Sequence, residues 1–203
     1  MRIVGGEWRG RRLKAPAGRA TRPTADRVRE AIFDVLGAAP PPVAAGAAAN
    51  GAETTGPNGP LAGVVVLDLF AGSGALGLEA LSRGAASCTF VEQAPAALRA
   101  LRANLAALEP AADSFAVLAL DYRRALKADA ARMRRYNLVL VDAPYASYPA
   151  VEPELAGRLP GVLASEAVVV VETARGQAVE LALAPLSVRL YGDTRVTFLQ
   201  ARS

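Results

Sequence analysis

Histidine is absent from the sequence of 203 residues, and cysteine occurs only once, as Cys88. Without histidine the chain cannot form a Ser-His-Asp triad, and it lacks the commonest general base and transition-metal ligand. A single cysteine can form neither an intramolecular disulfide nor a multi-cysteine zinc site. We therefore expect no metal, and a chemistry that depends on carboxylates, hydroxyls, backbone groups or an organic cofactor. Cys88 lies in an apolar stretch and is expected to be a small buried core residue.

Long uncharged apolar runs are also missing, so no segment is expected to span a membrane. Residues 1–6 lack the charged-then-apolar pattern of a signal peptide. With 52% hydrophobic residues, the chain can still bury the core of one ordinary domain. We therefore expect a cytoplasmic, monomeric protein.

Basic residues outnumber acidic ones in the first 36 positions, by nine to four, whereas the remaining chain is close to neutral. A basic segment on a near-neutral body is typical of proteins that bind phosphates, and nucleic acid is the partner that this favours. The alternative is a solvated tail that only aids solubility. The candidate nucleic-acid-binding residues are Arg9, Arg11, Arg12, Lys14, Arg19, Arg22 and Arg27.

Three segments precede the regular part of the chain. Residues 1–23 combine glycines with short β-friendly stretches and are predicted to form a small, basic β-hairpin arm. Residues 24–36 carry apolar side chains at helical spacing and are predicted to form a helix. Residues 37–63 consist mainly of Ala, Gly and Pro and are interpreted as a flexible insertion. We therefore divide the chain into the arm and one domain, residues 24–203.

Short apolar runs and helical stretches alternate through the rest of the chain. Strands are predicted at residues 64–68, 87–92, 115–120, 138–141 and 167–171, and helices at residues 95–107 and 123–135. Residues 188–199 predict an antiparallel hairpin. This order predicts an α/β fold: a Rossmann-like, mostly parallel, doubly wound sheet that ends in the antiparallel hairpin. In the second of these helices we expect Leu126, Ala130 and Met133 to face the core.

Glycines cluster in residues 68–77, after the first predicted core strand, and we name this segment the glycine turn. Gly72, Gly74 and Gly77 match the pattern G-x-G-x-x-G, and Glu92 closes the next strand, where a carboxylate can hold ribose hydroxyls. Glycine lets the backbone approach a ligand closely. The pattern fits a dinucleotide or S-adenosylmethionine, and the alternative is a tight turn without a ligand.

A second candidate site, the 142–145 turn, follows the fourth predicted strand and consists of Asp142, Ala143, Pro144 and Tyr145. An exocyclic amino nitrogen is a poor nucleophile because its lone pair is delocalised into the base. A carboxylate and a neighbouring backbone carbonyl can accept its two N–H bonds, so that the lone pair faces a methyl donor. The tyrosine can stack on an extruded base, so its ring rather than its hydroxyl is expected to matter. The alternative is a plain Asp-x-Pro turn, which is common.

Together the two turns resemble those of class I amino-methyltransferases. The whole chain outside residues 37–63 resembles the bacterial 16S ribosomal RNA guanine-N2-methyltransferase family. The matching stretches are residues 2–6, 10–13, 22–24, 26–30, 67–84 and 191–194. The chain departs from that family at Ala143, where the family usually has a second proline, and in the insertion.

The resemblance implies that S-adenosylmethionine binds at the glycine turn. It places Asp68 at the methionine end of this cofactor, Glu92 at its ribose and Asp121 at its adenine edge. The candidate cofactor-binding residues are Asp68, Phe70, Gly72, Ser73, Gly74, Glu92 and Asp121. The candidate catalytic residues, which would hold the target base, are Asp142, Ala143 through its carbonyl, Pro144 and Tyr145.

The activity implied by the resemblance is methylation of the N2 amino group of a guanine in 16S ribosomal RNA, at position 966. The RNA would be free or part of a small-subunit assembly intermediate, and the arm would contact its phosphates. Three alternatives stay open. A DNA adenine-N6 amino-methyltransferase uses the same tetrapeptide, and a nicotinamide-dependent oxidoreductase shares the glycine turn. An RNA-binding assembly factor could retain the cofactor pocket without turnover.

Overall fold

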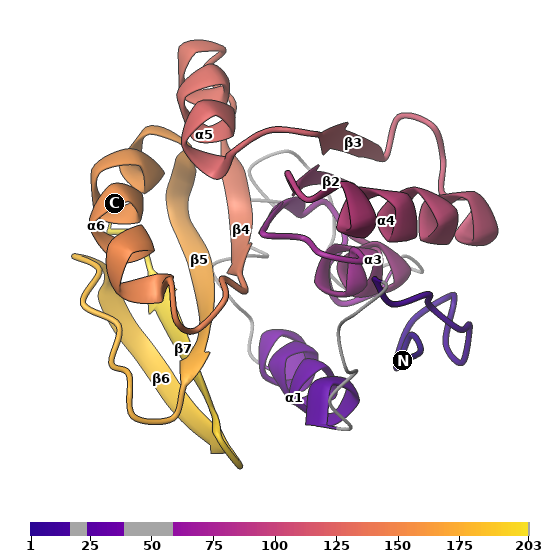
Figure 1. Ribbon diagram of the computed structural model, residues 1–203, viewed down its shortest axis with the longest axis horizontal. Coiled ribbons are helices and arrows are strands. Elements are labelled where there is room, and N and C mark those ends of the chain that lie inside the picture. The colour runs from indigo at the N-terminus through magenta and orange to yellow at the C-terminus, as the bar shows by residue number, and fades with distance from the viewer. Residues whose placement is uncertain (17–23, 39–58, 203) are drawn as a thin grey trace.

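The structure, a computed structural model, describes residues 1–16, 24–38 and 59–202 (Figure 1). The strands are β1 (Val65–Leu69), β2 (Ser87–Val91), β3 (Phe115–Leu118), β4 (Tyr136–Val141), β5 (Leu163–Ala174), β6 (Ala184–Tyr191) and β7 (Thr194–Gln200). The helices are α1 (Thr24–Ala38), α3 (Ala75–Ser82), α4 (Pro95–Leu108), α5 (Tyr122–Ala131), α6 (Tyr148–Arg158) and the short 3₁₀ helix η1 (Leu159–Gly161). The strands form one sheet in the order β3-β2-β1-β4-β5-β7-β6.

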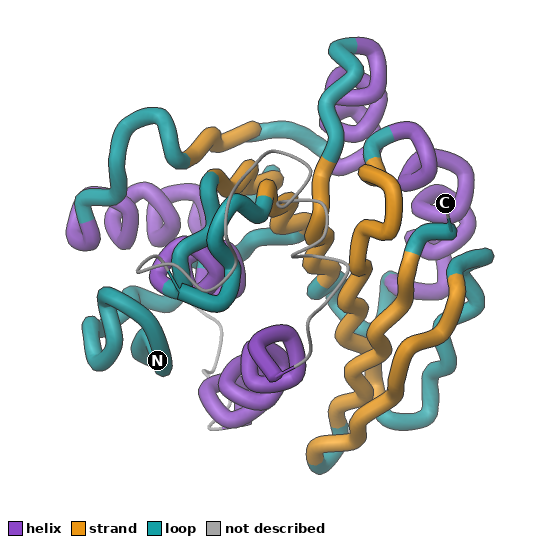
Figure 2. The backbone as a smooth tube through the Cα atoms, turned by 180° about the vertical axis from the view of Figure 1, so that it is seen from behind, coloured by secondary structure: helices purple, strands orange, loops and turns teal. Residues whose placement is uncertain are grey.

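The strand order reverses between β1 and β4. The chain moves outward from β1 through β2 to β3, then returns to β4 and continues to β5, and these five strands run parallel. β7 is antiparallel to β5 and pairs with β6, and this hairpin lies side by side with β5 at one end of the sheet (Figure 2). The predicted doubly wound sheet with a C-terminal antiparallel hairpin is confirmed.

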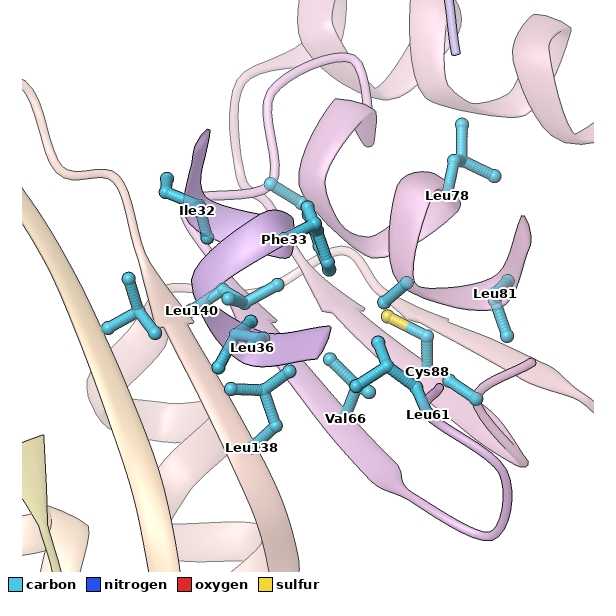
Figure 3. Packing of buried hydrophobic residues seen from close by; sticks show 14 of the residues in the cluster. Ile32, Phe33, Leu36, Leu61, Val66, Leu78, Leu81, Cys88, Leu138 and Leu140 are labelled. Atoms are coloured by element: carbon cyan, nitrogen blue, oxygen red, sulfur yellow. The ribbon is translucent and has the colours of Figure 1, made fainter. Parts of the chain in front are cut away.

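Each face of the sheet has its own helices, because successive side chains of a strand point to opposite faces. On one face Val66, Leu138 and Leu140 pack with residues of α1, α3 and α4 (Figure 3). On the other face Leu67 and Val139 pack with residues of α5 and α6. Burial on both faces explains why β1 and β4 are continuous apolar runs. The sole cysteine lies in the first of these cores with 1% of its surface exposed, as expected.

The described residues of the arm, 1–16, form the predicted hairpin and lie against the body of the protein. Arg2 and Arg12 form an antiparallel bridge, and Ile3 N donates a hydrogen bond of 2.9 Å to the Arg11 carbonyl. Ile3 and Leu13 are buried in the same core cluster as α1 and α3. Over these residues the arm is therefore a docked element, and the division between arm and domain stays a prediction.

Two expectations need correction. α5 ends in a Schellman motif: Met133 N bonds to Ala130 O, Arg134 N bonds to Asp129 O, and Met133 takes the left-handed position with φ 54°. Met133 is consequently 79% exposed and does not face the core. In the predicted insertion, residues 37–38 continue α1 and residues 59–63 include a buried leucine, Leu61. Residues 39–58 lie outside the described part of the chain.

Candidate active site

The glycine turn and the 142–145 turn lie next to each other, at the carboxyl ends of β1 and β4. These two strands are neighbours and flank the reversal of strand order, where open α/β sheets bind ligands. Backbone hydrogen bonds connect the strand ends: Ala71 N donates to Val91 O at 3.0 Å, and Asp142 N donates to Leu69 O at 3.5 Å. The residues predicted for the cofactor and for the base therefore meet at one edge of the sheet.

Asp68 supports the glycine turn from within the sheet. Its side chain is 1% exposed, and its Oδ2 accepts a hydrogen bond from Gly77 N at 2.9 Å. Burial raises the pKa of Asp68 from 3.8 to about 7; the Gly77 hydrogen bond lowers it, and the charge of Glu92 raises it further. A cationic ligand bound beside this carboxyl would therefore favour its ionised form.

The three glycines of the glycine turn have different surroundings. A Cβ at Gly77 would lie 2.4 Å from Phe90 Cε1 and 2.6 Å from Cys88 Sγ, so glycine here allows α3 to pack against β2. A Cβ at Gly74, where φ is +82°, would lie 2.4 Å from a methyl of Leu101. At Gly72, where φ is +57°, the nearest atom would be 3.9 Å away. Of the three, Gly72 leaves the space that a closely approaching ligand needs.

Glu92 connects the glycine turn to the loop after β2. Its Oε2 accepts a hydrogen bond from Gly72 N at 2.8 Å, and its Oε1 accepts from Gln93 N at 2.8 Å and from Ala94 N at 2.7 Å. The side chain is only partly buried. Because a carboxylate offers about four lone-pair sites, these three bonds leave capacity for a ligand hydroxyl. The role at the ribose stays a prediction.

Asp121 and Phe70 each contact a residue of the first turn of α5. Asp121 caps this helix: it accepts a hydrogen bond from Arg123 N at 3.0 Å and pairs with the Arg123 guanidinium at 2.9 and 3.1 Å. The hydrogen bonds to Arg123 lower the pKa of Asp121. The Phe70 ring lies 4.9 Å from the Tyr122 ring, and its φ of 62° is strained for a residue with a side chain. The adenine contact predicted for Asp121 would have to share a carboxylate that Arg123 already engages.

Ser73 is held by Asn104, a residue that the sequence pattern did not single out. Its carbonyl accepts a hydrogen bond from Asn104 Nδ2 at 2.9 Å. The same amide binds Lys14 of the arm, since Nδ2 donates to Lys14 O at 3.0 Å and Oδ1 accepts from Lys14 N at 2.7 Å. Asn104 is 1% exposed in the middle of α4. A single asparagine in an amphipathic helix matches no motif, so only the structure identifies this connection.

In the 142–145 turn, Asp142 is exposed, Ala143 is 1% exposed and Pro144 is exposed. The Pro144 carbonyl is occupied, because Ser147 donates to it from its backbone N at 2.9 Å and from its hydroxyl at 2.8 Å. These bonds close the turn before α6 begins. The Asp142 side chain lies at the surface beside the glycine turn, where it can reach a ligand.

Tyr145 is held by two residues that the sequence analysis did not assign to the site. Its hydroxyl donates a hydrogen bond of 2.8 Å to Glu172 Oε1 on β5 and lies 2.9 Å from Thr194 Oγ1 at the start of β7. Burial raises the pKa of Tyr145 to about 12; the Thr194 hydroxyl lowers it, and the charge of Glu172 raises it. The phenol therefore stays protonated near neutral pH and cannot act as a base there. In the sequence, the only sign that Thr194 belongs to the site was its place in the matching stretch 191–194.

The predicted nucleic-acid-binding residues that the structure describes are exposed: Arg9, Arg11, Arg12, Lys14 and Arg27. Arg11 donates a hydrogen bond to the Ala107 carbonyl, which fixes it near the end of α4. Arg19 and Arg22 lie outside the described residues. The exposed cations of the arm are thus anchored on the body instead of being carried on a free tail.

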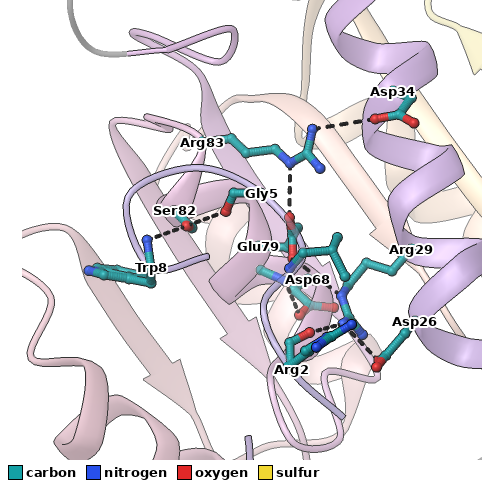
Figure 4. Close-up of polar contacts among 12 residues, drawn as sticks. Arg2, Gly5, Trp8, Asp26, Arg29, Asp34, Asp68, Glu79, Ser82 and Arg83 are labelled. Atoms are coloured by element: carbon teal, nitrogen blue, oxygen red, sulfur yellow. Dashed lines mark hydrogen bonds and ion pairs between the residues drawn. The ribbon is translucent and has the colours of Figure 1, made fainter. Parts of the chain in front are cut away.

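A buried ionic cluster fastens the arm to α1 and α3 (Figure 4). Glu79 is 0% exposed, accepts a hydrogen bond from Val4 N at 2.9 Å, and pairs with Arg83 at 2.9 Å and with Arg29 at 3.4 Å. Arg29 is 3% exposed and also donates to the Arg2 carbonyl. Arg29 was counted among the basic residues of the first 36 positions, but it is buried here and cannot contact phosphates.

Across residues 1–16, 24–38 and 59–202, no helix is long and apolar enough to cross a membrane. The same residues contain no group of three or more acidic or cysteine side chains that could hold a metal ion.

Three comparisons relate this geometry to known proteins. The model of the family Conserved hypothetical protein 95 matches residues 1–200. Ribosomal RNA small subunit methyltransferase D of Escherichia coli K12 and YlbH of Bacillus subtilis are each 39% identical over 145 residues. These matches span 71% of this chain and 60% and 67% of the two relatives. The structure of a hypothetical protein from Thermus thermophilus covers 99% of both chains, with 30% identity and a TM-score of 0.76.

Proposed function

The chain belongs to the family described as Conserved hypothetical protein 95. Because it is also similar to Ribosomal RNA small subunit methyltransferase D, we propose that it is an S-adenosylmethionine-dependent methyltransferase of ribosomal RNA. The observation that supports this most directly is the adjacency of the two turns. The Asp142 backbone contacts Leu69 at the end of β1, so a base held by the 142–145 turn lies beside a cofactor held by the glycine turn. This adjacency favours a methyltransferase over a nicotinamide-dependent oxidoreductase, which has no need of the 142–145 turn.

The finer proposal is that the methylated atom is the N2 amino nitrogen of a guanine in 16S ribosomal RNA, with position 966 as the nucleotide to test. The Asp142 carboxylate and the Ala143 carbonyl would accept the two N–H bonds of this amino group. Both are acceptors, and a carboxylate also stabilises the positive charge that develops on the nitrogen during transfer. Tyr145 would stack on the base, which has to leave its helix to reach the site.

The glycine turn fits the proposed cofactor. Gly72 leaves room for a ligand at the backbone, and the Glu92 carboxylate, tied to Gly72 N, faces the same loop. When bound, S-adenosylmethionine supplies a methyl group activated by a sulfonium. Asp68, the buried first residue of the turn, has its pKa raised to about 7, and that positive charge would favour its ionised form. The protein contributes position and electrostatic complementarity instead of a covalent intermediate.

The exposed cations of the docked arm would bind the phosphates of the RNA. Fixed cations lose less conformational freedom on binding than those of a free tail, so they favour one register of the RNA. Exchanging Arg9 and Arg12 together for alanine should weaken RNA binding at low salt. The slope of the logarithm of the affinity against the logarithm of the salt concentration should become shallower by up to about two. An unchanged slope would show that the RNA takes another path.

Asp142→Ala tests the proposed chemistry. Because Asp142 is used mainly in the transition state, the variant should lower the single-turnover rate of methyl transfer to 16S ribosomal RNA by at least about a hundredfold. Binding of S-adenosylmethionine, measured by calorimetry, should change little. Asp113→Ala is the matched control, since Asp113 is an exposed acid that precedes β3 at the opposite edge of the sheet.

The substrates used in this assay separate the alternatives. Transfer to DNA adenine in preference to RNA would support the DNA methyltransferase, and binding of NAD would support the oxidoreductase. RNA binding without any transfer of labelled methyl would support the assembly factor. Near-normal transfer by Asp142→Ala would refute the role of the 142–145 turn.

A further inference from the structure

The stacking platform of the proposed site is supported by two strands that lie beyond it in the chain. We infer that Glu172 and Thr194 are positioning residues that hold the Tyr145 ring in the orientation that receives the target base. This inference rests on the proposed function, because it specifies how the base-holding part of that site is built. It assigns a role to Thr194, which lies in the matching stretch 191–194 that had no functional interpretation.

Glu172 and Thr194 approach the Tyr145 hydroxyl from the same face of the sheet. Glu172 lies opposite Val196 in the antiparallel pairing of β5 and β7, and Thr194 lies two residues before Val196. Side chains that are paired across a ladder, or two apart along a strand, point to the same face. The Thr194 hydroxyl lies 2.9 Å from the Tyr145 hydroxyl, and because Thr194 is only 5% exposed, this contact lies in a mostly dry environment.

The two hydrogen bonds can be assigned a direction. The phenol has one proton, and it donates this proton to Glu172 Oε1 at 2.8 Å. The Thr194 hydroxyl, at 2.9 Å, must then be the donor to the phenol oxygen. A ring that is held at its backbone and again at its far end by a donor and an acceptor cannot swing freely, which is what a stacking platform requires.

The hairpin turn places Thr194. Gly192 has φ 57°, a left-handed conformation that glycine adopts at little cost, and Thr194 is the first residue of β7. Arg175, directly after β5, donates from its backbone N to Asp193 O at 2.8 Å and from its guanidinium to Gly192 O at 3.0 Å. The turn is thereby fixed to the end of β5, so the hydroxyl at position 194 has a defined place.

The chain offers a matched pair of threonines for a test. Thr197 lies on the same strand, is 4% exposed, and its hydroxyl has no hydrogen-bond partner among the described residues. Thr194→Val should lower the single-turnover rate of RNA methylation by about fivefold, which corresponds to about 1 kcal/mol. Thr197→Val should leave the rate within about twofold, because it removes a hydroxyl without a partner. Thr194→Ser should restore most of the rate, since it returns the donor.

A double-mutant cycle distinguishes positioning of Tyr145 from a general effect on the hairpin. In a Tyr145→Phe background, Thr194→Val should cause little further loss, because the hydroxyl that it positions is already gone. Glu172→Gln supplies an independent variant, with a similar loss expected in the wild-type background and a much smaller one beside Tyr145→Phe. Binding of S-adenosylmethionine should be unchanged in all of these proteins, since none of the three residues lies in the glycine turn.

The outcomes separate this inference from the proposed function. If the wild-type protein does not methylate RNA, the proposed function fails. If the wild type is active but Thr194→Val and Thr197→Val have the same rate, the positioning role is overturned while the function stands. Additive losses from Tyr145→Phe and Thr194→Val would also overturn it, because they would show that Thr194 acts independently of Tyr145.

Discussion

The glycine turn and the 142–145 turn lie side by side but are stabilised in different ways. In the glycine turn, carboxylates bind backbone N–H groups, and the partners are 9 positions apart for Asp68 and Gly77 and 20 apart for Glu92 and Gly72. In the 142–145 turn, the deciding bonds join side chains, and Tyr145 is 27 positions from Glu172 and 49 from Thr194. The first is a main-chain structure held by the neighbouring strands β1 and β2, and the second depends on strands much further along the chain.

This difference predicts how each turn responds to change. Variants of the glycine turn should alter stability and cofactor binding, because Gly74 and Gly77 pack closely against side chains of α4 and β2. In the 142–145 turn, variants of Asp142 should alter turnover with little effect on stability, because this side chain is exposed. The following predictions test that division, from the largest expected effect to the smallest.

Asp68→Asn should remove a large pH dependence of stability. Because burial raises the pKa of Asp68 in the folded state to about 7, its contribution to stability is fully present below its unfolded pKa of 3.8 and is lost as the pH rises through 7. Asparagine can accept the Gly77 bond without charge. Between pH 4 and pH 8 the ligand-free wild type should therefore lose roughly 3 to 4 kcal/mol relative to the variant.

Urea denaturation of both proteins at pH 4, 6 and 8 measures this difference, and effects of the other ionisable groups cancel in it. Parallel pH profiles would show that the pKa of Asp68 is not raised in the folded protein.

Gly77→Ala and Gly72→Ala should separate packing from ligand space. The Gly77 variant places a methyl against Phe90 and Cys88, so the free energy of unfolding should fall by about 1 to 3 kcal/mol. The Gly72 variant meets no close neighbour and should cost about 1 kcal/mol for its left-handed backbone. In calorimetry, however, Gly72→Ala should weaken S-adenosylmethionine binding more than Gly77→Ala does. The opposite ranking for binding would mean that Gly72 does not face the cofactor.

Glu92→Ala should weaken S-adenosylmethionine binding by about 1 to 3 kcal/mol, since it removes the proposed ribose contact and the bond to Gly72 N. Glu92→Gln keeps one acceptor oxygen and should show a smaller loss. The comparison uses calorimetry on variants with unchanged circular dichroism. Equal affinity of Glu92→Ala and wild type would remove Glu92 from the cofactor site.

Tyr145→Phe gives the smallest effect, though not a silent one. The ring alone was expected to matter, but the hydroxyl makes two hydrogen bonds in the structure. Its loss should cost about 1 kcal/mol, seen as a several-fold lower single-turnover rate at unchanged cofactor affinity. Tyr145→Ala also loses stacking and should cost more, both in rate and in RNA binding. Equal rates for wild type and Tyr145→Phe would show that only the ring of Tyr145 matters, as the sequence predicted.

The sequence predicted what depends on local pattern. Continuous apolar runs indicated β1 and β4, and the spacing of the glycines indicated the turn beside them. Met133 was placed wrongly because helical spacing continues past Ala131, whereas the backbone ends the helix there. Periodicity reports which residues could share a face but not where capping stops the helix.

The sequence could not predict contacts between distant segments. Nothing near Glu172 or Thr194 marks them as partners of Tyr145, since their proximity follows from the order of β4, β5 and β7. Arg29 was included in the count of basic residues that favoured nucleic acid, because charge counting ignores burial. Its burial is possible because Glu79, 50 positions later, pairs with it.

Asn104 has a consequence for how the two substrates influence each other. One buried amide holds both Lys14 of the arm and Ser73 of the glycine turn. If RNA draws Lys14 away from its place, Asn104 must either follow, and move Ser73, or lose its bonds. The affinities for the two ligands are then thermodynamically linked, and linkage is reciprocal: whatever factor RNA imposes on the cofactor's binding constant, the cofactor imposes on that of the RNA.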